Sequence, residues 1–333
     1  MAFLRRLLIA VGVFVALLGL LWGTLALWID GPSSPWLAGS LAGGYALIGL
    51  YMLWQLRTAA SAGLALLLWL GIAATWEQTI PPRNDRQWMP DVENLPTATL
   101  DGDRLTVRNV RDFDYHASDA DFTPRWETRT YDLTQLRGGD IFFSFWGPTD
   151  IAHTIASWDF GDDRHLAISI ETRKEVGESY SAVRGFFRQY ELYYVVADER
   201  DVIGVRANQR GEHVFLHALL LPPDVARALL LEYVGAVNRL AVQPSWYNAL
   251  TQNCTTSIRK HAARVMPLQP WSWQLLLNGH LEEMWYRNGV FHTALPFSEF
   301  KQRSEVTERA KAAEDAPDFS SRIRQGLPEP PAR

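Results

Sequence analysis

Cysteine is almost absent from this chain of 333 residues, which contains Cys254 and no other. A single cysteine cannot close an intrachain disulfide, so a disulfide framework is excluded. The chain also lacks a phosphate-binding glycine loop and a G-x-S-x-G elbow, which removes the sequence support for those nucleotide-binding and serine-hydrolase classes. The formal net charge of −5 offers no basic excess, and no nucleic-acid partner is expected.

Charge is scarce in the N-terminal quarter. From position 7 to position 76 the charged residues are Asp30 and Arg57 alone. About 20 apolar residues cross the hydrocarbon core of a bilayer. The uncharged runs therefore predict three transmembrane helices, at about residues 7–29, 36–56 and 58–76. A signal peptide is the competing interpretation of the first run, but its apolar core is longer than usual and a second run follows directly.

Positive charges predict the orientation of these helices, because Lys and Arg favour the cytoplasmic side. In a three-helix arrangement Arg5, Arg6 and Arg57 fall on one side. The N-terminus is then cytoplasmic, and everything after Trp76 lies outside the cytoplasm. If the third run, which starts with weakly hydrophobic residues, does not span, this orientation inverts. We expect residues 1–80 to form the membrane anchor.

The remaining chain is predicted to be α+β. Apolar and polar residues alternate around Asp101-Gly102 and around residues 161–164, which indicates two β-hairpins. The spacing changes after Pro222-Pro223 to three and four residues and predicts helices at 224–241 and 253–265. We expect one domain over residues 81–309, followed by a charged, proline-bearing tail, 310–333, that is disordered. Further strands are predicted at 127–136 and 139–147, and the segments 186–201 and 212–221 suit either two more strands or a strand and a short helix.

Cys254 lies in the stretch QNCTTSIRKH, after a loop and at the start of the second predicted helix. A helix N-terminus and a nearby histidine both lower a thiol pKa from about 8.5. Thr251 or Asn253 is predicted to cap the helix, and the free N–H groups beside the cap can receive an oxyanion. Cys254 is therefore a candidate nucleophile, with a small buried hydrophobic residue as the alternative.

A nucleophilic cysteine needs a base, and the second hairpin favours His153. If its turn pairs residues whose numbers sum to about 324, His153 lies across from Glu171, with about 5 Å between their Cβ atoms. A carboxylate there can hold the imidazole in one tautomer, whereas a slip of one residue would separate the two side chains. His165, which pairs with Asp159 in the same register, is the second choice of base.

The stretch ETRKEVGESY supplies further polar side chains after Glu171. Two interpretations stay open. The stretch is either a solvated strand end or a polar wall beside the catalytic groups, with Arg173, Glu178 and Tyr180 in supporting roles. His213 and His217 lie on one side of a predicted strand without a further ligand set, so neither a metal nor another cofactor is expected.

Three segments in order resemble the Lnb N-terminal periplasmic domain family: TDIAHTIASWDFGDDRHLAISIETRKEVGESY, GFFRQYELYYVVADERDVI and WYNALTQNCTTSI. The likeness covers roughly residues 83–264. It implies a permuted papain-like thiol fold with an antiparallel sheet and packed helices, preceded by membrane helices. Carried over to this chain, it implies Cys254 as nucleophile with Asn253 beside it, His153 as base and Glu171 as the third group.

The resemblance also sets the functional expectation. It implies a multi-pass protein of the bacterial inner membrane whose C-terminal domain lies in the periplasm. The expected activity is that of a thiol acyltransferase or hydrolase on an ester or amide, with the lipid bilayer and a lipoprotein or phospholipid substrate as partners. Two alternatives stay open: a cysteine peptidase or amidase acting on the cell wall, and a non-catalytic envelope module that binds a partner.

Overall fold

The computed structural model describes the chain except for residues 1, 56–58, 292, 315 and 329–333. The chain divides into two compact units. The first contains Met1–Arg83 and Tyr180–Glu191, and the second contains Asn84–Ser179 and Leu192–Arg333. The junction after Arg83 lies close to the predicted end of the anchor at residue 80. Unlike the prediction, however, the segment 180–191 belongs to the unit that contains the N-terminal helices.

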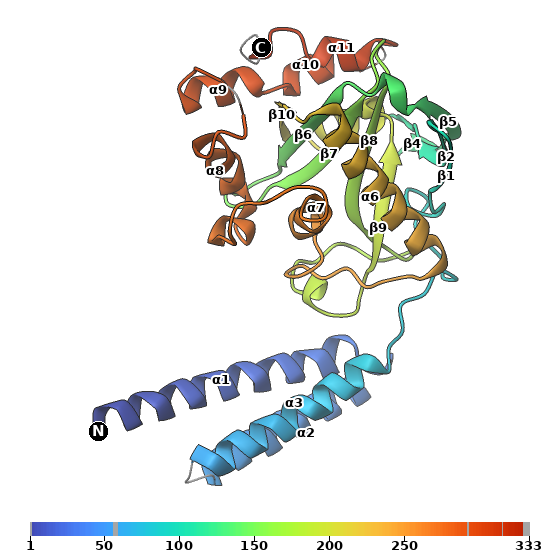
Figure 1. Ribbon diagram of the computed structural model, residues 1–333. Helices are drawn as coiled ribbons and strands as arrows, with labels where there is room; N and C mark the ends of the chain where they lie inside the picture. The colour runs from blue at the N-terminus through green and yellow to red at the C-terminus, as the bar shows by residue number, and fades with distance from the viewer. Residues whose placement is uncertain (1, 56–58, 292, 315, 329–333) are drawn as a thin grey trace. The chain divides into compact units, whose positions relative to one another are not determined.

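The first unit contains three helices among its described residues, α1 (Ala2–Ile29), α2 (Pro35–Gln55) and α3 (Ala59–Gln78) (Figure 1). By length and composition, α1 over Arg6–Ile29 and α2 are long and apolar enough to cross a membrane. The helix predicted at 58–76 is present as α3. The helix ends predicted at residues 56 and 58 lie outside the described part of the chain.

The segment 180–191 belongs to the first unit because its side chains bond the ends of these helices. Arg188 donates from Nε to a carboxylate oxygen of Glu77 at 2.7 Å and from Nη1 to the carbonyl of Ile80 at 3.0 Å. Gln189 donates from Nε2 to Oδ1 of Asp30 at 2.7 Å. Polar contacts at the last residues of α1 and α3 therefore hold this segment.

The second unit is built on a sheet that has eight strands in the described chain, in the order β1-β2-β9-β8-β7-β6-β10 with β5 also paired to β2. The pairs β1–β2, β2–β5, β6–β7, β7–β8 and β6–β10 are antiparallel, while β2 and β9 are parallel. Two short strands, β3 and β4, pair separately. The strands are β1 (Thr97–Asp101), β2 (Arg104–Arg111), β3 (Asp114–Tyr115), β4 (Phe122–Thr123), β5 (Trp126–Asp132), β6 (Gly138–Phe145), β7 (His153–Asp159), β8 (His165–Arg173), β9 (Glu191–Ala197) and β10 (His213–Leu219).

The β7–β8 hairpin has the predicted register. Ile155 lies opposite Ser169 and Asp159 opposite His165, so the paired numbers sum to 324. Its turn contains Gly161, Asp162 and Asp163 with φ of 76°, 50° and 61°. Glycine and aspartate tolerate this left-handed backbone better than most residues, which explains why GDD closes the hairpin and fixes its register.

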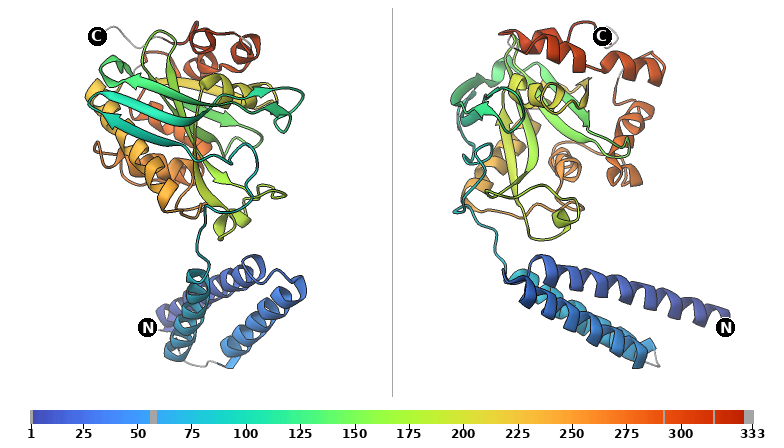
Figure 2. Two further views of the ribbon diagram at one scale, coloured as in Figure 1. Left: turned by 90° about the vertical axis from the view of Figure 1, so that its right-hand side faces the viewer. Right: turned by 180° about the vertical axis from the view of Figure 1, so that it is seen from behind.

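Helices cover both faces of the sheet (Figures 1 and 2). Successive strand residues point to opposite faces, and both Tyr193 and Tyr194 of β9 are buried. Tyr193 belongs to a core cluster with residues of α4, α5, α10 and α11, whereas Tyr194 packs edge-on against Tyr233 of α6. The predicted α+β class is therefore confirmed. The helices are α4 (Glu199–Val202), α5 (Gly204–Ala207), α6 (Pro223–Val242), α7 (Cys254–Ala262), α8 (Leu281–Arg287), α9 (Phe297–Ser304), α10 (Thr307–Ala312) and α11 (Phe319–Ile323), with 3₁₀ turns η1 (Leu133–Gln135), η2 (Arg184–Phe186), η3 (Trp273–Leu275) and η4 (Asn278–His280).

The prediction that residues 310–333 are disordered is wrong for the described part of this tail. Helix α11 packs into the core through Phe319 and Ile323, which are 2% and 0% exposed. These two residues are four apart and share one helix face. The composition of the whole tail is charged and rich in proline, so it gives no sign that two apolar residues four positions apart form a helix face that packs into the core. Residues 315 and 329–333, which also fall in the predicted tail, lie outside the described chain.

Candidate active site

Helix α7 begins at Cys254, and Asn253 is its cap. Oδ1 of Asn253 accepts a hydrogen bond from the Thr256 N–H at 2.9 Å, and Oγ1 of Thr256 accepts one from the Asn253 N–H at 3.0 Å. This reciprocal capping box fixes the first turn. The backbone N–H groups of Cys254 and Thr255 form no hydrogen bond with described residues. They are free donors at the positive end of the helix dipole.

His153 is the first residue of β7, and its ring contacts two residues of β8. Its Nε2 lies 3.1 Å from Oε1 of Glu171 and 2.7 Å from Oγ of Ser169. Ser169 donates its own hydroxyl proton to Oε1 of Glu171 at 2.7 Å. The serine oxygen therefore accepts from Nε2–H, which fixes the proton on Nε2 in the neutral ring and leaves Nδ1 unprotonated. The structure thus brings His153 and Glu171 together, as the hairpin register predicts.

Cys254 is buried, 8% exposed, and lies close enough to His153 for the charge of that ring to act on its thiol. Burial raises the pKa of this thiol, but the charge of His153 and the hydrogen bonds from His153 and Thr154 outweigh it and bring the pKa down to about 6. Burial lowers the pKa of His153, but the charge of the Glu171 carboxylate outweighs burial, and the pKa is raised to about 9. Between these two values the site holds a thiolate and an imidazolium.

Arg206 of α5 forms an ion pair with Glu171. Its Nη2 donates to Oε1 of Glu171 at 2.6 Å and its Nη1 to Glu212 at 3.4 Å. Burial raises the pKa of Glu171, but the charges of His153 and Arg206 hold it well below its usual range. Sequence reasoning missed both Ser169 and Arg206. Ser169 carries a weak signal, because it is two residues before Glu171 and therefore shares its strand face; Arg206 carries none.

Asn278 joins the two halves of the site. Its amide exchanges hydrogen bonds with the backbone of Ala152, accepting at 2.9 Å and donating at 2.6 Å. It also donates to Oγ1 of Thr255 at 2.7 Å. Asn278 is 7% exposed and thereby connects the residue before His153 with the residue after Cys254. Nothing in its sequence context indicated this role.

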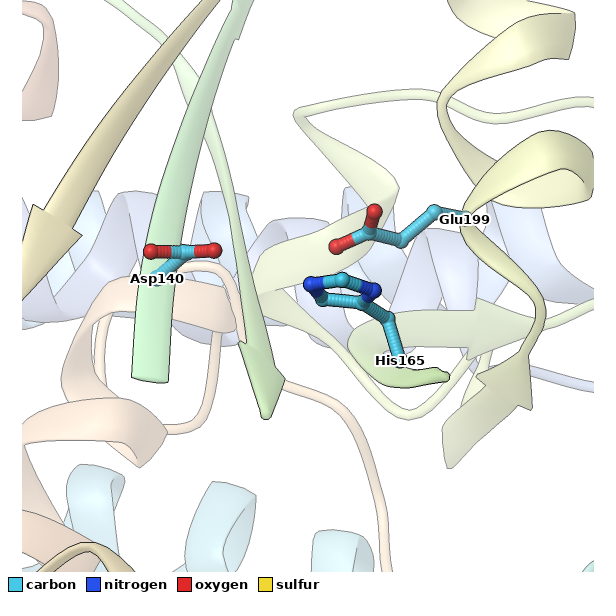
Figure 3. A group of neighbouring side chains, drawn as sticks. All are labelled: Asp140, His165 and Glu199. Carbon is cyan, nitrogen blue, oxygen red and sulfur yellow. The ribbon is translucent and has the colours of Figure 1, made fainter. Parts of the chain in front are cut away.

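His165, the second choice of base, is not placed beside the nucleophile. It starts β8, six residues before Glu171, which along a strand is about 20 Å. Its ring lies with Asp140 and Glu199 (Figure 3), and the three potential ligand atoms are within 4.8 Å of one another. Carboxylates and imidazole can hold a divalent cation. Here, however, Arg324 donates to Glu199 at 2.7 Å and to Asp140 at 3.1 Å, and supplies the compensating positive charge.

The three predicted supporting residues after Glu171 have different surroundings. Arg173 is buried, 2% exposed, and donates to the carbonyls of Val92 and Glu93 at 3.0 and 2.6 Å. Arg173 therefore links the segment before β1 to the sheet, and this end of β8 is not solvated at Arg173. Glu178 accepts a hydrogen bond from the backbone of its own turn. Tyr180 belongs to the first unit and stacks on a tyrosine there.

Large apolar side chains are exposed on the three segments that lead into the site, a surface we call the apolar rim. Two of these segments are fastened together, because His280 bonds Asp150 at 2.8 Å and Gly279 donates to the Asp150 carbonyl at 2.9 Å. Exposed apolar clusters of this kind mark contacts with proteins, membranes or ligands. The rim consists of Trp146, Ile151, Leu250, Trp271, Trp273, Leu276 and Leu277.

Residues 122–279 match the model of a family described as the Lnb N-terminal periplasmic domain. The matched range contains His153, Glu171, Cys254 and Asn278, and it begins and ends later than the range 83–264 expected from the motifs. No curated protein and no solved structure matches the chain.

Proposed function

We propose that this chain, which belongs to the Lnb N-terminal periplasmic domain family through residues 122–279, is a membrane-anchored thiol acyltransferase or hydrolase. The alignment of Cys254, His153 and Glu171 carries the proposal. A buried thiol with ordinary surroundings has a raised pKa and is inert, whereas the pKa of Cys254 is lowered to about 6. The three residues have the relations that a nucleophile, its base and the group that orients the base require.

The proposed reaction begins with attack of the Cys254 thiolate on the carbonyl carbon of an ester or amide. The oxygen that becomes negative accepts hydrogen bonds from the free N–H groups of Cys254 and Thr255, the role of an oxyanion hole. The His153 imidazolium then gives its proton to the departing alcohol or amine, which leaves a thioester on Cys254. An attacking amine or water loses a proton to His153 and releases the acyl group. Glu171 and Ser169 keep the ring oriented through both steps.

The apolar rim favours a lipid substrate over a peptide of the cell wall. A peptidase acting on cell-wall peptides requires a polar cleft, whereas the segments that precede His153, Cys254 and Asn278 here expose tryptophan and leucine side chains. Tryptophan is enriched where proteins meet the membrane interface. We therefore propose an acyl ester of a phospholipid or lipoprotein as substrate.

Membrane anchoring agrees with this choice of substrate. Helices α1 and α2 have the length and composition of membrane spans. We propose that α3 (Ala59–Gln78) is a third span. With three spans, the positive charges at Arg5, Arg6 and Arg57 favour a cytoplasmic N-terminus and a periplasmic catalytic domain, and we propose the inner membrane as the site of the anchor.

The direct test is capture of the acyl-enzyme. Full-length protein in detergent is incubated with phosphatidylethanolamine, and acylation of Cys254 is measured by mass spectrometry before and after hydroxylamine, which cleaves thioesters. We expect a hydroxylamine-sensitive acyl group that is absent in Cys254→Ser and His153→Ala. Cleavage of cell-wall peptide without acylation by phospholipid would identify a peptidase. Retention of the cellular function in Cys254→Ser would identify a binding module.

A matched pair of leucine variants tests the lipid preference. Leu277 of the apolar rim is 42% exposed, and Leu100 at the far edge of the sheet is 47% exposed. We expect Leu277→Gln to slow acylation by phospholipid while sparing a short soluble ester, and Leu100→Gln to affect neither. Equal loss on both substrates in Leu277→Gln would contradict a role in lipid contact.

A further inference from the structure

A pocket lies farther along α7, between this helix and α6. Helix α7 lines it with Ser257, Lys260 and His261, whose spacing of three and four residues places them on one face, and Arg264, two residues past the helix end, also lines it. Helix α6 contributes Ala236, Arg239 and Leu240 to the lining, and β9 contributes Leu192 and Tyr194. The pocket has a volume of about 360 Å³, which lies in the range of about 300–1,000 Å³ typical of ligand sites.

The pocket contains an excess of positive charge. Arg239, Lys260 and Arg264 line it, and no aspartate or glutamate does so among the described residues. Arg264 is paired with Glu232 at 2.9 Å, and Lys260 donates one of its three protons to the carbonyl of Thr251 at 3.0 Å. The guanidinium of Arg239 forms no ion pair or side-chain hydrogen bond in the part of the chain described. At least two cationic groups are thus left without a carboxylate partner.

Neutral hydrogen-bonding groups complete the lining. The hydroxyl group of Ser257 and the amide of Gln252 border the pocket. His261 is 4% exposed, and its Nε2 is bonded to the Tyr194 hydroxyl at 2.7 Å. Burial and the charge of Arg264 lower the pKa of His261 to about 4, so its ring adds no charge at neutral pH. The pocket therefore combines cations with neutral polar groups.

We propose that this α6–α7 pocket binds a phosphate ester. A tetrahedral oxyanion has enough acceptor oxygens to satisfy several cations at once, and charge-assisted hydrogen bonds of this kind are the strong ones. The volume leaves room for the polar group esterified to the phosphate. His261 is seven residues beyond Cys254, about 10 Å along the helix axis. The site is thus separate from the thiol, and its occupancy does not depend on the chemistry proposed for Cys254.

The phosphate ester can come from a soluble metabolite or from a phospholipid headgroup, and two probes distinguish these sources. Binding is measured with full-length Cys254→Ser protein in a non-ionic detergent at low ionic strength, so that no turnover occurs. One titration uses sn-glycerol 3-phosphate and the other uses phosphatidylglycerol dispersed in the same detergent. The test variants are Arg239→Gln and Lys260→Gln. The matched control is Arg259→Gln, because Arg259 is on the same helix but donates to Gln269 and does not line the pocket.

We expect saturable binding of at least one probe, weakened about tenfold or more in both test variants and unchanged in Arg259→Gln. Binding of sn-glycerol 3-phosphate assigns a soluble ester, and binding of phosphatidylglycerol alone assigns a lipid headgroup. The proposal would be overturned if neither probe bound, or if Arg259→Gln weakened binding as much as the test variants. Melting temperatures identify a variant that fails to fold, and the other test variant then decides.

Discussion

Replacing His153 by alanine should change the pH profile of Cys254 alkylation in a way that no general loss of reactivity can imitate. In the native protein His153 lowers the pKa of the thiol to about 6. Without that charge, burial dominates and raises the pKa to at least the ordinary value of about 8.5. The midpoint of alkylation by iodoacetamide therefore moves upward by at least about 2.5 pH units.

The rates follow from two opposing effects. At pH 6 about half of the native thiol is ionised, since its pKa is about 6, against about 0.3% in the variant with a pKa of about 8.5, a ratio of about 150. A thiolate of lower pKa is intrinsically less nucleophilic, by about 13-fold over 2.5 units at a Brønsted slope of about 0.45. The native protein should thus react about tenfold faster at pH 6. At pH 8.5 the native thiol is fully ionised beside a His153 that is still mostly protonated, since the pKa of His153 is about 9. About half of the variant's thiol is ionised at this pH, so the variant should react faster by about sixfold.

The two profiles must therefore cross, and the crossing is the diagnostic result. Initial rates of alkylation between pH 5 and 10, read by mass spectrometry of the peptide containing Cys254, measure it. His165→Ala serves as the control, because His165 lies with Asp140 and Glu199 at the other end of the β7–β8 hairpin. Parallel profiles for native protein and His153→Ala, or a native midpoint near 8.5, would refute the thiolate–imidazolium pair.

Three further variants test the surroundings of this pair. Hydrolysis of a short 4-nitrophenyl ester should follow a bell-shaped pH profile, because the rate falls below the Cys254 pKa of about 6 and above the His153 pKa of about 9. Glu171→Gln removes the charge that raises the His153 pKa, so the alkaline limb of the profile should move to lower pH. Asn278→Ala should lower kcat about tenfold or more with little change in KM, since misplacement of reacting groups is costly, and an unchanged kcat would exclude a positioning role. Arg324→Ala leaves the buried Glu199 carboxylate without its cation, so urea unfolding should show a loss of about 3 kcal/mol, whereas Arg322→Ala, which breaks an exposed pair, should leave stability unchanged.

The features that could be predicted from the sequence are those set by local pattern. The period of two in β7 and β8, with GDD at the turn, determines which residues face each other, and this alone brings Glu171 to His153. The single asparagine before Cys254 likewise reveals the cap of α7. In each case the interacting residues lie within one hairpin or one helical turn, so the spacing along the chain is also the spacing in the structure.

The features that were missed depend on contacts between distant segments. Asn278 meets Ala152 across 126 residues, and Arg206 meets Glu171 from a four-residue helix with no pattern of its own. Arg324 lies in a tail whose composition indicates disorder, yet it bonds Asp140 across 184 residues. Polar partners of this type have no periodicity, and only the assembled fold shows that they meet.

The order of charges explains why the site tolerates so many ionised groups in little space. The Cys254 thiolate faces the His153 imidazolium, which faces Glu171, which in turn faces Arg206. Each group has a neighbour of opposite sign, and removal of one leaves the next as a buried uncompensated charge, which is strongly destabilising. An alanine variant at Glu171 or Arg206 would therefore confuse loss of stability with loss of chemistry. The isosteric change Glu171→Gln keeps the shape and removes the charge, so a displaced pH limb in a protein of unchanged melting temperature isolates the electrostatic role of the carboxylate.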